Sequence, residues 1–143
     1  MKKIIITGAS SGIGAATARL AVSKGHHVML IGRREDRLQK IATELGDNAK
    51  FAVVDVCNTE NIASFFKTIP EDFDVLVNNA GLALNIDMAP DVPLEDWDTM
   101  VQTNVTGLIH FTHKALTIMK PKGAGHIVNV GSSTGHISYP GAN

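Results

Sequence analysis

The sequence predicts a doubly wound α/β fold, in which helices cover both faces of a parallel β-sheet, and three observations support this prediction. Short apolar runs of strand length alternate with longer amphipathic stretches along the chain. The first two helical stretches stop at glycines, and the first strand leads directly into a glycine-rich turn. Because strands that alternate with helices are joined by right-handed crossovers, the strands should be parallel.

The predicted strands are short apolar runs; in chain order they span Lys3–Thr7, His27–Gly32, Phe51–Val56, Val75–Asn78 and Ile127–Val130. We expect them in the order 3-2-1-4-5, with the first strand central. The predicted helices are Ile13–Lys24 before Gly25, Arg34–Leu45 before Gly46, a third capped by Asn58 or Thr59, and a long fourth from Leu94 to Met119 that ends before Pro121. The stretch from Gly81 to Pro93 is predicted to be irregular, because it contains two prolines.

Composition limits the partners that the protein could have. The 143 residues are 44% hydrophobic and 19% charged, with a formal net charge of −1, as in an ordinary single domain. This charge offers no electrostatic footprint for nucleic acid or an anionic membrane, so a small-molecule partner is expected. Cys57 is the one cysteine, and the sequence opens on a strand with no signal-peptide pattern, which favours a cytoplasmic protein.

The most informative segment is Thr7–Gly14, a glycine turn between the first strand and the first helix. A helix start presents free N–H groups and a positive dipole end, so it can bind a diphosphate. We expect Gly8 to take a positive φ, Gly12 to leave room for phosphates, and Gly14 to allow close helix packing. A turn glycine can also be purely steric. A P-loop is excluded, because Ala15 and Ala16 stand where it needs Lys followed by Ser or Thr.

Further motifs follow in a defined order: the Asp55–Val56 pair, Asn78–Gly81, Asn104 and Gly131–Ser132. Together with the glycine turn, these motifs resemble the short-chain dehydrogenase/reductase family over the whole length of the chain. The resemblance implies a Rossmann fold and an oxidoreductase that moves a hydride between nicotinamide and a carbonyl or secondary alcohol carbon.

The same resemblance assigns a cofactor role to two motifs. An acid at the Asp55 position binds the adenine amino group in the family, and Asn78–Gly81 stabilises the sheet and lines the ribose. From the residues alone, Asp55 could instead cap a turn, and Asn78 and Asn79 could satisfy their own backbone. The full set of predicted cofactor-binding residues is Gly8, Ser10, Ser11, Gly12, Ile13, Gly14, Arg33, Arg34, Asp55, Val56, Asn79, Ala80 and Gly81.

The end of the second strand favours NADP (NADPH) over NAD. Arg33 and Arg34 stand where an NAD enzyme would place a carboxylate for the ribose 2′-hydroxyl. A guanidinium binds a 2′-phosphate through paired charge-assisted hydrogen bonds, and Ser10 can add a hydroxyl contact. The alternative is that both arginines only begin a solvated helix with Glu35 and Asp36.

The family's reaction uses a Ser, an Asn, a Tyr and a Lys, of which Ser132 and Asn104 match here. Tyr139 does not match Tyr-x-x-x-Lys, because Asn143 stands where the Lys should be. The segment from Tyr139 to Asn143 instead resembles the stretch before the active-site Tyr. Residues 1–143 are therefore expected to form one NAD(P)-binding domain that is incomplete at its C-terminus and inactive alone.

Within the family, Asn79–Leu84, Glu95–Asp98 and Gly131–Gly135 resemble the NADP-dependent 3-hydroxy acid and serine dehydrogenases. Family members pair through the long helix, so a homo-oligomer, dimer or tetramer, is expected. The alternative function is a non-catalytic module that senses NADP. No metal site is expected, because His110 and His113 share a helix face without a third ligand in register.

Overall fold

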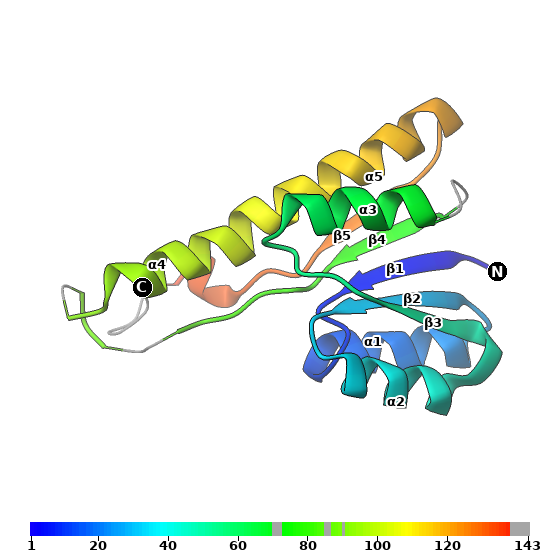
Figure 1. The fold of residues 1–143 in the computed structure, drawn as a ribbon, viewed down its shortest axis with the longest axis horizontal. Coiled ribbons are helices and arrows are strands. Elements are labelled where there is room, and N and C mark those ends of the chain that lie inside the picture. The colour runs from blue at the N-terminus through cyan, green and yellow to red at the C-terminus, as the bar shows by residue number, and fades with distance from the viewer. Residues whose placement is uncertain (70–72, 85–86, 90, 138–143) are drawn as a thin grey trace.

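The computed structural model describes residues 1–69, 73–84, 87–89 and 91–137, and these form a parallel sheet in the order β3-β2-β1-β4-β5 (Figure 1). The strands are β1 Lys3–Thr7, β2 His27–Gly32, β3 Ala49–Val53, β4 Val75–Asn78 and β5 His126–Asn129. The helices are α1 Gly12–Ser23, α2 Glu35–Leu45, α3 Thr59–Thr68, α4 Leu94–Val101 and α5 Leu108–Lys122. The predicted fold class and strand order are confirmed.

Helices cover both faces of the sheet, with α1 and α2 on one side and α3 and α5 on the other (Figure 1). Successive strand residues point to opposite faces, so Ile5 and Ile6 belong to different cores. Ile6 packs with Leu30 on the α1 side, whereas Ile5 packs with Phe111 on the α5 side. The near-continuous apolar strands are the expected result of burial on both faces.

The third strand differs from its prediction at both ends. The predicted span is Phe51–Val56, but β3 begins with Ala49 opposite Val28 and ends with Val53 opposite Gly32, where β2 also ends. Val54 and Val56 are nevertheless 3% and 8% exposed. Their burial reflects packing in the core beyond the last residue of β3, although the Val54 N–H still donates to the Gly32 carbonyl at 2.9 Å.

The long fourth helix also departs from its prediction. It is divided by a π-helical segment, Gln102–Gly107, between α4 and α5. The helix does not end before Pro121, because the proline lies in the last turn of α5, where its missing N–H removes a single helical bond. Gly123 ends the helix instead, with φ of 62°. In the part of the chain that the structure describes, no helix has both the length and the apolarity to cross a membrane.

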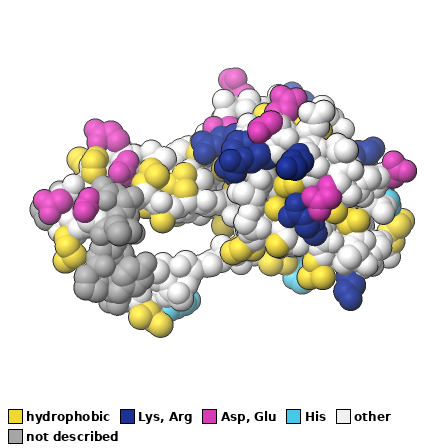
Figure 2. Space-filling model, turned by 90° about the horizontal axis from the view of Figure 1, so that it is seen from below, with side chains coloured by type: hydrophobic (Ala, Val, Ile, Leu, Met, Phe, Trp, Pro, Cys, Tyr) yellow, Lys and Arg dark blue, Asp and Glu magenta, His cyan; other side chains and the backbone are white. Residues whose placement is uncertain are grey.

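Charge is unevenly spread over the molecule. The face in Figure 2 carries its basic side chains over the half that contains α1 and α2, whereas the α4 end carries acidic ones. Glu95 and Asp96 occupy the first turn of α4, where carboxylates interact favourably with the helix dipole.

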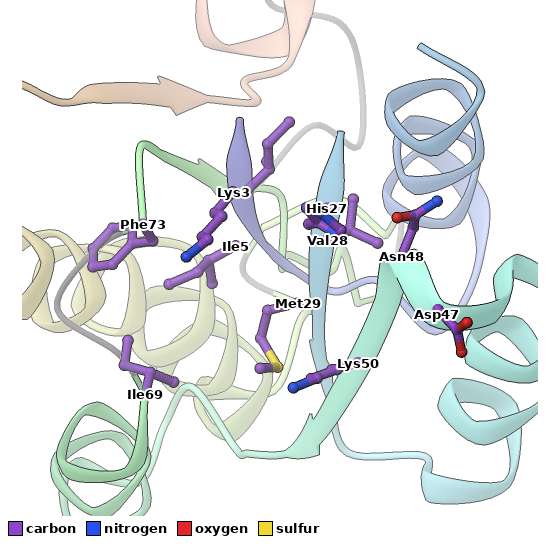
Figure 3. Close-up of a pocket in the computed structure, with 11 residues that line it drawn as sticks. Lys3, Ile5, His27, Val28, Met29, Asp47, Asn48, Lys50, Ile69 and Phe73 are labelled. Carbon is purple, nitrogen blue, oxygen red and sulfur yellow. The ribbon is translucent and has the colours of Figure 1, made fainter. Parts of the chain in front are cut away.

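A cavity of about 330 Å³ opens at the amino ends of β1, β2 and β3 (Figure 3). Ile5, Met29 and Phe73 contribute apolar surface to it, and Lys3 and Lys50 contribute ammonium groups. This cavity lies at the opposite end of the strands from the glycine turn.

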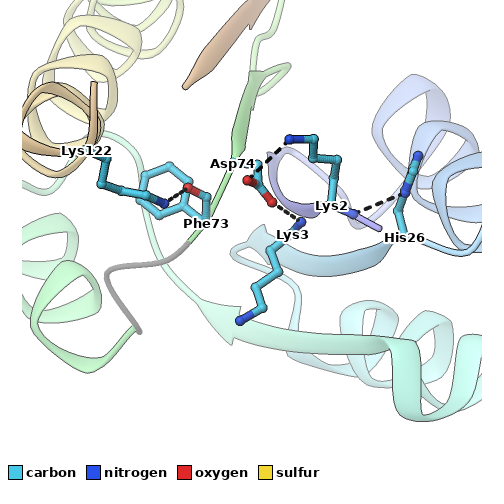
Figure 4. A network of polar contacts seen from close by, with 6 residues as sticks. All are labelled: Lys2, Lys3, His26, Phe73, Asp74 and Lys122. Atoms are coloured by element: carbon cyan, nitrogen blue, oxygen red, sulfur yellow. Dashed lines mark hydrogen bonds and ion pairs between the residues drawn. The ribbon is translucent and has the colours of Figure 1, made fainter. Parts of the chain in front are cut away.

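Beside this cavity, Asp74 joins the amino ends of β1 and β4 (Figure 4). Its carboxylate accepts the backbone N–H of Lys3 at 2.8 Å and lies 3.6 Å from Nζ of Lys2. The Lys3 hydrogen bond, with lesser contributions from Lys2 and Lys122, holds the pKa of the Asp74 carboxyl below its ordinary value.

We expect Asp74→Asn to lower the free energy of unfolding by about 1 kcal/mol at pH 7, because a charge-assisted bond becomes a neutral one. A carboxyl group whose pKa is lower in the folded than in the unfolded state stabilises the folded protein at pH values above its unfolded-state pKa. This stabilisation is lost as the pH falls through the folded-state pKa. The free energies of unfolding of the wild type and the variant, measured with urea, should therefore become equal below about pH 3. Asp98→Asn, on exposed α4, is the control, and a difference that persists in acid would contradict the assignment.

Candidate functional site

The predicted cofactor-binding residues surround a second cavity, of about 560 Å³, at the carboxyl ends of the strands. Every predicted cofactor-binding residue lines it except Gly14, which lies in the first turn of α1. The cavity spans the boundary between β1 and β4, where the chain reverses its direction across the sheet. Ligands of open α/β sheets bind at this switch point.

The glycine turn has the shape that was predicted. Gly8 has φ of 65°, and a Cβ there would lie 2.8 Å from Cα of Ala80. A Cβ on Gly14 would lie 2.5 Å from Nδ2 of Asn79 and 2.6 Å from the Gly8 carbonyl oxygen. Gly12 faces open space, with φ of 53°. Gly8 and Gly14 therefore allow close approach, and Gly12 leaves the mouth of the turn open.

The first helix begins at this turn without a side-chain cap. Ser11 occupies the N-cap position in an extended conformation, and its hydroxyl accepts no hydrogen bond from the α1 backbone. The first-turn N–H groups of a helix have no partner inside the helix. Together with the helix dipole, they give the cavity an anion-binding end.

Arg34 lies over the glycine turn from the neighbouring strand. Its guanidinium donates from Nε and Nη2 to Oγ of Ser10, at 3.2 and 2.9 Å, and from Nη2 to Oγ of Ser11, at 2.7 Å. Ser10 is 8% exposed, so it is a buried anchor for this arginine. Arg33 lines the same cavity and is exposed. Both arginines are exposed and line the cavity, but the hydrogen bonds to Ser10 and Ser11 come from Arg34.

Thr7 makes contacts behind the cavity that sequence reasoning missed. Its Oγ1 accepts the N–H groups of Asn79 and Ala80, at 3.0 and 2.9 Å, and donates to the Val77 carbonyl at 3.4 Å. The Asn79 side chain also bonds to the glycine turn, because its Nδ2 donates to the Thr7 carbonyl at 2.9 Å and to the Gly8 carbonyl at 3.3 Å. Thr7 therefore ties the glycine turn to the end of β4.

Asp55 caps a local turn, which is the alternative to a cofactor contact that its sequence position left open. Its Oδ1 accepts the N–H of Cys57 at 2.9 Å, and the residue still lines the cavity. Cys57 follows, with Sγ 3.3 Å from Oγ1 of Thr103. A carboxylate accepts several hydrogen bonds, so this turn and a ligand contact are compatible.

Asn104 lies in the π-helical segment between α4 and α5. Its side chain makes two hydrogen bonds with the backbone of Leu82. Oδ1 accepts from the Leu82 N–H at 2.9 Å, and Nδ2 donates to the Leu82 carbonyl at 2.8 Å. Asn104 Oδ1 would lie 3.2 Å from a Cβ on Gly81, so the asparagine borders the cavity without lining it. π-helical turns often occur at functional sites.

Ser132 follows β5 in the chain. Its Oγ accepts from Thr134, at 3.2 Å from the N–H and 2.8 Å from the hydroxyl, and caps the short helix Ser133–Gly135. Ser132 is exposed and does not line the cavity. Tyr139 and Asn143 lie outside the described residues. Within the described ranges, no three His, Cys, Asp or Glu side chains gather as a metal site would require.

Asn78 connects this side of the site to the sheet. Its Nδ2 donates to Oγ1 of Thr112 and to Oδ1 of Asn129, each at 2.9 Å. Asn78 is 3% exposed and lies opposite Asn129 in the strand register, so its side chain links β4 to both β5 and α5. These contacts are compatible with the sheet-stabilising role that the resemblance implied for the motif.

This fold, with an open helix start and a glycine turn at the switch point, defines a dinucleotide-binding class of protein. The sequence profile described as short chain dehydrogenase matches residues 2–143, so the chain belongs to the short-chain dehydrogenase family.

Two kinds of curated relatives cover 98% of the chain. It is 44% identical to an NADP-dependent 3-hydroxy acid dehydrogenase of Salmonella typhi and 45% identical to a serine 3-dehydrogenase of Agrobacterium fabrum. The chain spans 58% and 57% of the length of these relatives.

Among solved structures, the closed form of a serine dehydrogenase complexed with NADP⁺ superimposes with a TM-score of 0.94. That protein is 42% identical, and the match covers 97% of this chain and 57% of that one. A serine dehydrogenase from Escherichia coli gives a TM-score of 0.95 at 40% identity, over 98% of this chain and 66% of that one.

Proposed function

We propose that this chain is the cofactor-binding part of an NADP-dependent oxidoreductase of the short-chain type, acting on a 3-hydroxy acid such as serine. The observation that carries this proposal is the pairing of an uncapped helix start with a guanidinium that is anchored over the same turn. These groups suit a ligand with two separate anionic parts, as NADP has in its diphosphate and its 2′-phosphate.

The glycine turn would hold the diphosphate. The first turn of α1 has no side-chain cap, its residues Gly12 and Ile13 line the cavity, and a Cβ on Gly12 would meet nothing within 4 Å. Because Gly8 and Gly14 let α1 approach Asn79 closely, the backbone reaches the phosphates without an intervening side chain.

Arg34 would bind the 2′-phosphate, with Ser10 adding a hydroxyl and Arg33 adding positive charge. A planar guanidinium presents paired donors that match phosphate oxygens. No carboxylate stands at the end of β2, so nothing there would repel the phosphate.

Asp55 and Val56 would contact the adenine, and the backbone of Asn79, Ala80 and Gly81 would line the ribose on the nicotinamide side. Both groups already line the cavity, on opposite sides of the switch point. Ile13 is 64% exposed at the helix start and would cover the bound cofactor.

When bound, the nicotinamide supplies the hydride acceptor or donor. Ser132 would orient the substrate oxygen by hydrogen bonding, and Asn104 would support proton transfer from its position against Leu82. The family's reaction also needs a phenol with a lowered pKa beside an ammonium group. The Ser132 hydroxyl only accepts from Thr134, so its own hydrogen would remain available to donate to a substrate oxygen.

An exposed apolar stripe on the long helix supports a homo-oligomer. Val101, Val105 and Ile109 are 53%, 50% and 54% exposed at helical spacing. A stripe of this kind on a surface helix is normally covered by a partner. Light scattering of the full-length protein tests this part of the proposal. We expect the molar mass of a dimer or a tetramer.

Titration of the full-length protein with NADPH and NADH, followed by cofactor fluorescence, tests the cofactor assignment. We expect tighter binding of NADPH, and equal affinities would contradict the role of Arg34. Serine-dependent reduction of NADP⁺, followed by absorbance, tests the reaction. Tight NADPH binding without turnover of any hydroxy acid would instead support a sensing module.

A further inference from the structure

The π-helical segment Gln102–Gly107 contacts both halves of the proposed cofactor site. Its residue Thr103 lines the cavity around the glycine turn and is 8% exposed. The same lining includes Asp55–Cys57, where the adenine is proposed to bind, and Leu82, on the proposed nicotinamide side. π-helical turns are rare in proteins, and many of them lie at functional sites. Through Thr103, the long helix contributes to the site itself.

On the proposed adenine side, the π-helical segment holds the turn that follows β3. Sγ of Cys57 lies 3.3 Å from Oγ1 of Thr103, and Nε2 of Gln102 donates to the Cys57 carbonyl at 3.4 Å. Gly107 is buried, and a Cβ there would lie 2.8 Å from the Val56 carbonyl oxygen. The helix therefore approaches the backbone of Val56 as closely as a residue without a side chain permits.

On the proposed nicotinamide side, the same helix holds the chain that follows β4. Asn104 bonds to the N–H and the carbonyl of Leu82, at 2.9 and 2.8 Å. One helical turn earlier, Sδ of Met100 accepts the N–H of Leu84 at 3.5 Å. Thr103 and Asn104 are consecutive residues, so a displacement of one of them moves the other.

We propose that Thr103 is a positioning residue that couples the adenine end of the cofactor site to Asn104. Its hydroxyl and the thiol of Cys57 form the contact through which the turn after β3 locates the helix, and the next peptide bond places Asn104. A cofactor that orders Asp55–Cys57 therefore also fixes Asn104, because coupling is carried by side chains in contact. The proposal rests on the proposed function, which supplies the adenine site and the role of Asn104.

The partner of the Thr103 hydroxyl supports this role. Threonines in helices commonly bond to a carbonyl of the preceding turn. Thr99 and Thr117 do so in α4 and α5, where their hydroxyls donate to the carbonyls of Glu95 and Lys114, each at 2.7 Å. The hydroxyl of Thr103 instead contacts a side chain from another segment, and that segment lines the cofactor cavity.

Full-length protein labelled with ¹⁵N-asparagine, titrated with adenosine 2′,5′-bisphosphate, tests the proposal without turnover. This fragment carries the adenine and the 2′-phosphate of NADP but no nicotinamide. An Asn104→Asp variant assigns the side-chain amide signal of Asn104 by its loss. We expect the fragment to shift this signal in a saturable way, because it orders the turn that Thr103 contacts. Thr103→Val, which keeps the volume but loses the hydroxyl, should reduce the shift at saturation by about threefold or more.

Matched variants show whether the contact itself carries the effect. Thr103→Ser keeps the hydroxyl and should restore the shift. Cys57→Ala removes the same contact from its other side and should reproduce the loss, and the double variant should be no worse than either single one. Thr99→Val removes a threonine hydroxyl that bonds within its own helix one turn away, so it should respond as the wild type does.

Turnover of serine gives a second measurement. Thr103→Val should lower kcat by about fivefold and change KM for NADP⁺ by less than about twofold. An Asn104 signal that the bound fragment leaves unchanged, or a shift in Thr103→Val as large as in the wild type, would overturn the proposal and leave the proposed function intact. A fragment that does not bind would overturn both, because the adenine site would then be wrong.

Discussion

Replacing Gly14 with alanine will weaken NADPH binding by about tenfold or more and lower the free energy of unfolding by about 2 kcal/mol. The added Cβ would lie 2.6 Å from the Gly8 carbonyl oxygen, which is backbone and has no rotamer to change. Either α1 moves away from β1 or the glycine turn moves outward. In both cases the N–H groups at the helix start lose the geometry that the diphosphate needs.

Gly25→Ala is the matched control for this substitution. Gly25 follows the other end of α1, with φ of 78°, and a Cβ added there would meet no neighbour within 4 Å. It should cost about 1 kcal/mol through backbone strain and leave cofactor affinity unchanged. NADPH fluorescence titration and urea unfolding measure the two effects. If Gly14→Ala bound NADPH as the wild type does, the close-packed turn would have no part in binding.

Arg34→Ala should weaken NADPH binding by roughly 10- to 100-fold, the cost of losing a charge-assisted contact with a phosphate. The affinity for NADH should change far less, because NADH carries a hydroxyl where NADPH carries the 2′-phosphate. Arg33→Ala should have the smaller effect, because the hydroxyls of Ser10 and Ser11 anchor Arg34.

Arg37→Ala is the control for nearby positive charge, because Arg37 is exposed on α2 and does not line the cavity. It should bind both cofactors as the wild type does. Titrations with both cofactors and all three variants measure the ratio of affinities. Equal losses for NADPH and NADH in Arg34→Ala would mean that the arginine only supports the glycine turn.

The sequence was sufficient to predict the order of the strands, because alternating apolar runs mark the strands and the topology rules of doubly wound folds then order them. It also predicted the positive φ of Gly8, because a glycine between a strand and a helix is a local pattern that indicates a tight turn. The cap of α3 was equally local, since Asn58 accepts the N–H groups of Glu60 and Asn61, each at 2.9 Å.

Other features depend on contacts between distant parts of the chain. The end of β3 is set by where β2 stops, so the apolar residues Val54 and Val56 did not mark it. The choice of Arg34 over Arg33 depends on the place where α2 begins relative to Ser10. The π-helical segment that contains Asn104 lies against Leu82, which belongs to another segment of the chain, so local sequence did not indicate it.

The bonds between Thr7 and Asn79 join positions 72 residues apart. A nascent chain from which Asn79 has not yet emerged holds the glycine turn but lacks the groups that fix it. Contacts of such long sequence separation form late in folding. The nucleotide would therefore recognise only chains in which β4 has docked beside β1, and it would act as a check on completed assembly.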